Sequence, residues 1–232
     1  MRSREIISGV YQLTGGGTNL FVIAEEELTL IDTGLPGSST GIAAFIHRIG
    51  RSVEEISSII ITHNHIDHIG AVPELCRLNN IRIVAHKSDL AGFDTAPSYR
   101  QGVRRLLRVP FLHRVRRLFV LETADVSMQL EGGEVLQLLG GLIVIPTPGH
   151  TPGSICLYAP SHKLMFVGDA LQRRRKKLLL PAKMVSTDMP EAIDSVKKMA
   201  ELTPEILCFG HGKPLFEDAH KRLLALIECN GS

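Results

Sequence analysis

The stretch from Ile59 to Gly70, IIITHNHIDHIG, constrains this chain more than any other feature. An unbroken apolar run, typical of a buried strand, leads directly into three histidines and one aspartate. These residues are His63, His65, Asp67 and His68. They cannot all point one way on a regular strand or helix, but a loop at a strand end can turn them inward together. The stretch therefore predicts a metal site at the end of a strand.

Three other predicted strands also end in Gly or Pro and are followed by a metal-capable residue. The pairs are Leu142–Pro146 with His150, Leu164–Val167 with Asp169, and Ile206–Phe209 with His211. A lone histidine or Gly-Asp pair in such a place is more often a turn residue. Four strand ends of the same form outweigh that interpretation. Because a catalytic metal usually takes three protein ligands and a water, this many candidates indicates two metals.

The order of strand-like and helix-like segments predicts the fold class. Each half begins with short strands separated by Gly and Pro turns and continues with helices. We expect an α+β fold in which two mixed β-sheets pack face to face with helices outside, a four-layer αβ/βα sandwich. Residues 1–232 are expected to form a single domain. A basic insertion is expected at about 91–125.

Three local expectations are specific enough to compare with a structure. The sequence predicts one strand over Glu5–Leu13, a helix over Ala71–Asn79 and a terminal helix over Phe216–Glu228.

The composition favours a globular protein that needs neither disulfide bonds nor a structural metal site for its stability. The four cysteines lie far apart in the sequence and form no Cys-x-x-Cys pair, which argues against a disulfide framework and a thiolate zinc site. No apolar run approaches the length of a membrane-spanning helix, and the N-terminus lacks the apolar region of a signal peptide. We therefore expect a cytoplasmic protein.

The basic residues are unevenly distributed. Seven arginines lie between Arg100 and Arg117 and five basic residues between Arg173 and Lys177, which leaves 14 basic and 24 acidic residues elsewhere. Because Arg173, Arg174 and Arg175 follow Asp169 closely, they are candidates for binding an anionic small-molecule substrate. A solvated surface, a nucleic acid or an anionic membrane surface are the alternatives. His86, just after a strand, is a further candidate substrate contact.

The segments together resemble the metallo-β-lactamase-fold metallohydrolases over nearly the whole chain. The matching motifs are Asp32-Thr33-Gly34, IIITHNHIDHIG, PTPGHTPGS, FVGDA and CFGHGKP. The resemblance implies that His63, His65 and His150 hold one metal, that Asp67, His68 and His211 hold a second, and that Asp169 bridges them. It also implies that Asp32 braces the metal loop from behind.

The resemblance implies hydrolysis by a dinuclear metal site. Two divalent ions would share a hydroxide that cleaves a small ester, thioester, lactone or phosphodiester. Asp67 would orient that hydroxide and pass its proton onward. Zinc suits nitrogen and oxygen ligands with several imidazoles, although iron and manganese tolerate the same set. An aspartate at position 169 resembles the glyoxalase II, lactonase and phosphodiesterase-like branches, so antibiotic hydrolysis is not expected.

Two other function classes stay open from the sequence. Members of this fold also include iron-dependent oxidoreductases, either sulfur dioxygenases or diiron oxygen or nitric oxide reductases, and the latter would here lack a fused flavin domain. A non-catalytic binding module is disfavoured because all seven ligands are present. Within the hydrolases, a glutathione thioesterase is disfavoured, since the sequence continues for only one short helix beyond His211.

Overall fold

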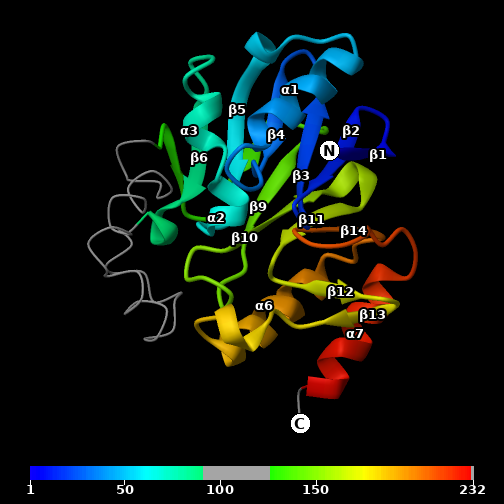
Figure 1. Cartoon of the computed structure of the whole chain (residues 1–232). Coiled ribbons are helices and arrows are strands. Elements are labelled where there is room, and N and C mark those ends of the chain that lie inside the picture. The colour runs from blue at the N-terminus through cyan, green and yellow to red at the C-terminus, as the bar shows by residue number, and fades with distance from the viewer. Residues whose placement is uncertain (91–125, 231–232) are drawn as a thin grey trace.

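The computed structural model describes residues 1–90 and 126–230. Within these residues, two β-sheets pack face to face, with helices on their outer sides (Figure 1). This arrangement confirms the expected α+β sandwich of two mixed sheets. The basic insertion expected at 91–125 lies outside the described residues.

The first sheet follows chain order from β1 to β7. Its strands are β1 (Arg2–Ile7), β2 (Val10–Gly15), β3 (Thr18–Ala24), β4 (Leu28–Ile31), β5 (Ile56–Ile61), β6 (Arg82–His86) and β7 (Met128–Leu130). The pairs from β1 to β4 are antiparallel, whereas those from β4 to β7 are parallel. Because β4, β5 and β6 are parallel, their C-terminal ends share one edge of the sheet.

The second sheet has the order β14-β11-β10-β9-β8. Its strands are β8 (Val135–Leu136), β9 (Leu142–Pro146), β10 (Ile155–Ala159), β11 (Leu164–Gly168) and β14 (Ile206–Phe209). A separate hairpin, β12 (Gln172–Arg174) and β13 (Lys177–Leu179), follows β11. It lies beside the C-terminal helix in Figure 1.

Helices connect the strands and cover the sheets. The α-helices are α1 (Ser38–Arg48), α2 (Ile66–Ile69), α3 (Val72–Leu75), α6 (Met189–Glu201) and α7 (Ala219–Asn230). Short 3-10 turns are η1 (Val53–Glu55), η2 (Lys87–Asp89), η4 (Pro160–His162) and η5 (Lys183–Val185). No helix within the described ranges is long and apolar enough to span a membrane.

Alternating side chains build three apolar layers. On β3, Leu20 and Val22 face α1, whereas Phe21 and Ile23 face the second sheet. Between the sheets, the rings of Phe21 and Phe166 meet edge to face with centroids 5.0 Å apart. A third layer packs the second sheet against α6 and α7. The sheets are thus held at a fixed spacing, which fixes the loops at their ends.

Two of the three local expectations differ markedly from the structure. The segment Glu5–Leu13 is not one strand, because the chain reverses at Gly9, whose φ of 76° suits a turn. The helix expected over Ala71–Asn79 ends at Leu75. The side chain of Asn79 donates to the backbone oxygens of Glu54 and Ile56, and this ties the chain to β5 instead of continuing the helix. The terminal helix begins at Ala219, close to the prediction.

Candidate metal centre

The seven metal-capable side chains predicted from the sequence converge at one end of the sandwich. They form three overlapping groups, and within each group the candidate ligand atoms lie within 4.8 Å of one another. The groups are His63, His65 and His150; His63, His68 and Asp169; and Asp67, His68 and His211. Four segments of the chain contribute to this cluster, each at the C-terminal end of a strand or directly after it.

Neighbouring hydroxyls fix the orientation of two of the imidazole rings. Nδ1 of His63 lies 3.1 Å from Thr62 Oγ1, which donates its own proton to Asp32. Nδ1 of His150 lies 3.2 Å from Ser186 Oγ, which donates its proton to the backbone oxygen of Ala182. Each ring must therefore carry its proton on Nδ1. The lone pair is left on Nε2, which is the atom that would bind a metal.

Acceptors outside the cluster fix a proton on Nδ1 of two further rings. His68 donates from Nδ1 to Asp32 Oδ2 at 2.8 Å, and His211 donates from Nδ1 to the backbone oxygen of Gly17 at 3.0 Å. In both cases Nε2 faces the cluster. An outer partner that sets the tautomer of a histidine is typical of metal ligands.

The cluster leaves buried polar atoms that an added cation would satisfy. Nε2 of His63, Nε2 of His68 and Oδ1 of Asp169 are buried without a hydrogen-bond partner among the described residues. A buried unsatisfied polar atom costs about 1–3 kcal/mol. Nitrogen lone pairs and carboxylate oxygens are also the ligands that zinc and related metals take. The donor set therefore fits a metal site.

The two carboxylates of the cluster have different surroundings. Asp169 Oδ2 lies 3.1 Å from Nε2 of His211 and 3.8 Å from Nε2 of His150, while its Oδ1 lies 3.6 Å from Nε2 of His68. It thus touches both ends of the cluster. Asp67 Oδ2 lies 3.3 Å from Nε2 of His211. The side chain of Asp67 is 28% exposed and that of Asp169 is 8% exposed, so Asp67 is the carboxylate that faces solvent.

Asp32 braces the histidine loop from behind. Its Oδ1 accepts from the backbone N–H of Thr62 at 2.8 Å, and its Oδ2 accepts from Thr62 Oγ1 and His68 Nδ1. The side chain is buried and belongs to none of the three ligand groups. It holds the start and the end of the loop together.

The electrostatics divides the histidines into two classes. Burial lowers the pKa of His63 well below its ordinary value, that of His65 to about 3 and that of His150 to about 4, which favours the neutral form that binds a metal. Burial also disfavours charged His68, but Asp32 and Asp169 outweigh it and raise its pKa to about 9. Hydrogen bonds to Asp169 and Asp67 raise the pKa of His211 to about 11. The same carboxylate field favours a cation placed between them.

The sequence profile of the Metallo-beta-lactamase superfamily matches residues 13–211, which include all seven candidate ligands. The chain belongs to the metallo-beta-lactamase superfamily. Two Bacillus subtilis proteins agree with this. The uncharacterized protein YobT is 31% identical over 84% of this chain and 83% of its own, and the probable metallo-hydrolase YflN is 30% identical over 91% and 86%.

A solved structure of the superfamily shows the same fold. The metallo-beta-lactamase family protein TTHA1429 from Thermus thermophilus superimposes with a TM-score of 0.76 at 21% identity, over 98% of this chain and 81% of its own. At this identity the similarity shows the fold alone. Buried histidine and aspartate clusters like the one described here are typical of metal sites in the superfamily.

The metal centre also includes Asp89 as a supporting residue, which no sequence motif marked. It ends η2, is 8% exposed, and accepts hydrogen bonds from Asn64, Thr151 and Gly153. Burial raises the pKa of this carboxyl, and the three donors oppose the rise. An aspartate after Lys87-Ser88 is typical of a turn, so no sequence signal marked it.

The candidate substrate residues occupy different positions. The guanidinium of Arg173 donates to the backbone oxygens of Lys213 and Pro214, so it supports the segment after His211. Arg174 and Arg175 are exposed on the β12–β13 hairpin. His86 is buried as the last residue of β6: its Nδ1 accepts from the backbone N–H of Ser88 at 3.2 Å, and its Nε2 lies 3.3 Å from the backbone oxygen of Glu131.

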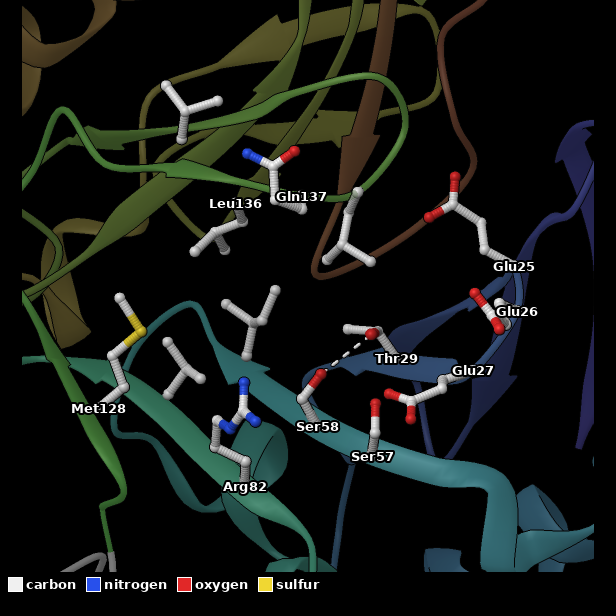
Figure 2. A pocket seen from close by; sticks show the side chains of 14 residues that line it. Glu25, Glu26, Glu27, Thr29, Ser57, Ser58, Arg82, Met128, Leu136 and Gln137 are labelled. Carbon is white, nitrogen blue, oxygen red and sulfur yellow. Dashed lines mark hydrogen bonds between the residues drawn. The ribbon is translucent and has the colours of Figure 1, made fainter.

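A separate pocket of about 590 Å³ opens at the other end of the parallel strands (Figure 2). Ser57, Ser58 and Arg82 at the starts of β5 and β6 form one wall, and Leu136 and Gln137 at β8 form the other. Because the candidate ligands follow the opposite ends of these strands, this pocket is distinct from the metal centre. None of the seven candidate ligands lines it.

Proposed function

We propose that the chain is a metal-dependent hydrolase that holds two divalent metal ions, with Zn²⁺ the best match to its ligands, and cleaves a small ester, thioester, lactone or phosphodiester. One observation carries the proposal: the Nε2 atoms of His63 and His68 and Oδ1 of Asp169 are buried close together and have no hydrogen-bond partner among the described residues. The name of YflN, a probable metallo-hydrolase, supports the same class.

The distances favour two ligand sets that share one carboxylate. His63, His65 and His150 form the first set, and Asp67, His68 and His211 the second. Asp169 reaches His150 on one side and His68 and His211 on the other, so it is placed to join the sets. Metal ions held in this way activate water and polarise the carbonyl or phosphoryl oxygen of a substrate.

The residues of the chain then have distinct tasks. Asp67 is the solvent-facing carboxylate, and His211 and His68 keep its pKa below the ordinary value although burial opposes this. The carboxylate therefore stays ionised, and its partial exposure places Oδ2 where it can orient the attacking water and pass a proton on to solvent. The hydroxyls of Thr62 and Thr151 both donate to carboxylates. They are thus committed to the scaffold, and water is the expected nucleophile.

Metal analysis joined to a substrate screen tests the proposal. Protein purified without chelator and reconstituted with zinc, manganese or iron should hold about two metal equivalents per chain. The metal-loaded protein should hydrolyse at least one class among chromogenic esters, thioesters, lactones and phosphodiesters, and Asp67→Asn should lower kcat.

Two outcomes would overturn the proposal. Binding of less than one metal equivalent under every reconstitution would remove the metal site. Consumption of oxygen by the iron-loaded protein, without hydrolysis of any substrate class, would assign it to the oxidoreductases instead. The metal content of the wild-type protein must be measured first, because both outcomes are judged against it.

A further inference from the structure

The two loops that supply the first ligand set belong to different sheets. The loop after β5 carries His63 and His65, and the loop between β9 and β10 carries His150. Imidazoles from separate sheets can share a metal only if something fixes the spacing of their loops. One direct link runs from the backbone N–H of Ile155 to the backbone oxygen of Thr62 at 2.9 Å.

Asp89 provides a second link, made by one buried side chain. Its Oδ2 accepts from the backbone N–H of Asn64 at 2.9 Å and from Thr151 Oγ1 at 2.7 Å, and its Oδ1 accepts from the backbone N–H of Gly153 at 2.7 Å. Its backbone oxygen also accepts from Asn64 Nδ2 at 2.8 Å. Asn64 lies between two ligands, and Thr151 follows the third.

The chain is packed to fit this carboxylate. A Cβ on Gly153 would lie 2.5 Å from the backbone nitrogen of Asp89 and 2.7 Å from its Oδ1, so only glycine allows the approach. Three donors converge on two acceptor oxygens. An amide in the same place would offer one acceptor oxygen and turn an N–H₂ donor toward at least one of them. The site is therefore specific for a carboxylate.

We infer that Asp89 is a positioning residue that sets the spacing of His63, His65 and His150 and thereby tunes the metal affinity of this ligand set. The inference rests on the proposed metal binding. Asp89 acts through the backbone of the loops and belongs to none of the ligand groups. Its effect should therefore be on the geometry of the first set and much smaller on the set of Asp67, His68 and His211.

The full-length protein carrying Asp89→Asn tests this with Co²⁺ as the probe. We expect the affinity of one of the two cobalt sites to fall about 10–100-fold, the range found when outer partners of metal ligands are changed. The visible absorption bands of that site should shift, while the other site keeps its affinity. The melting temperature of the metal-free protein should fall by only a few degrees, because the amide leaves a buried N–H donor without its acceptor at a cost of about 1–3 kcal/mol.

Three further variants separate positioning from folding. Thr151→Val removes the hydroxyl that donates to Asp89 and should weaken the same cobalt site. The double variant Asp89→Asn/Thr151→Val should lose less cobalt affinity than the product of the two single fold-losses, because the two residues form one contact. Asp194→Asn, on the exposed surface of α6, is the matched control and should change neither affinity nor spectrum.

The outcomes distinguish this inference from the proposed function. If wild-type protein binds no cobalt, the proposed metal site itself fails. If wild type binds two ions and Asp89→Asn binds both with unchanged affinity and spectrum, Asp89 does not position the ligands. Equal weakening of both sites would show a purely structural role and would also overturn the inference.

Discussion

Asp169 and Asp67 share one cluster, but their contacts differ. Asp169 reaches three histidines from both ligand sets, whereas Asp67 pairs with His68 and His211 of the second set. We predict that Asp169→Ala lowers the metal content from about two equivalents to less than one, because both sets lose a carboxylate. Asp67→Ala should retain about one equivalent. Elemental analysis after dialysis against metal-free buffer measures both.

The surface variant Asp194→Ala serves as the control for these measurements, since this exposed carboxylate pairs with Lys197 on the surface of α6. It should keep the wild-type metal content. Equal losses in Asp169→Ala and Asp67→Ala would contradict the assignment of Asp169 as the shared ligand.

At the scale of elements, glycines at strand ends allow the ligand loops to approach one another. A Cβ on Gly210 would clash with Asp169 Oδ1 and lie 2.7 Å from Cε1 of His68. We predict that Gly210→Ala displaces both side chains and weakens metal binding at least tenfold, measured by competition with a chromogenic chelator. Gly210 has no positive φ, so the effect would come from the clash and not from backbone strain.

A glycine in a helix gives the matched control. Gly41 lies within α1, and a Cβ there would meet the flexible end of Met1. Gly41→Ala should leave metal affinity unchanged and can stabilise the helix, because alanine restricts the unfolded chain. Normal metal affinity in Gly210→Ala would show that the loop relaxes without moving the ligands.

Apolar runs in the sequence predicted the strands that are buried on both faces. Apolar runs in β5, β9 and β11 identified strands correctly, because each strand packs against layers on both faces. The helix expected over Ala71–Asn79 was too long. Its end depends on hydrogen bonds from Asn79 to residues far away in sequence, and no local pattern reports such contacts.

The same limit applies to the site. The seven side chains brought together by the structure were marked in the sequence, since each is a His or Asp, which are residue types that bind metals, and each follows a predicted strand. Asp89 and Ser186 were missed because their roles depend on contacts with residues far away in the sequence. Asp89 accepts hydrogen bonds from Asn64 and Thr151, and Ser186 contacts His150. Those contacts arise only when the two sheets pack.

At the scale of the whole molecule, the layer between the sheets holds the ligand loops at a fixed spacing. Phe166 is fully buried there against Phe21. We predict that Phe166→Ala lowers the free energy of unfolding of the metal-free protein by about 3–5 kcal/mol, because it removes buried area and leaves a cavity. Urea denaturation measures the change.

Leu224 on α7 provides the comparison, since it is 43% exposed. Leu224→Ala should change the free energy of unfolding by about 0.5 kcal/mol or less. A change below about 1 kcal/mol in Phe166→Ala would mean that the two sheets do not depend on this contact.

The charge distribution of the whole molecule bears on substrate choice. Arg174 and Arg175 lie exposed on the hairpin that begins three residues after Asp169, and acidic residues outnumber basic ones outside the two basic segments. The guanidinium of Arg173 donates to the backbone oxygens of Lys213 and Pro214, so Arg173 supports the chain and is not counted among the arginines that face solvent. We propose that the two exposed arginines attract anionic substrates toward the metal centre by their field.

Replacing Arg174 and Arg175 by Ser should therefore raise KM several-fold for anionic substrates and leave KM for neutral analogues nearly unchanged. The difference should shrink between about 0.1 and 1 M salt, because the screening length falls from about 10 Å to about 3 Å. Replacing Arg2 and Arg4, exposed on the edge strand β1, removes the same charge elsewhere and controls for net charge. Equal effects on both substrate types, or equal effects of the two double variants, would reduce Arg174 and Arg175 to a solvated surface.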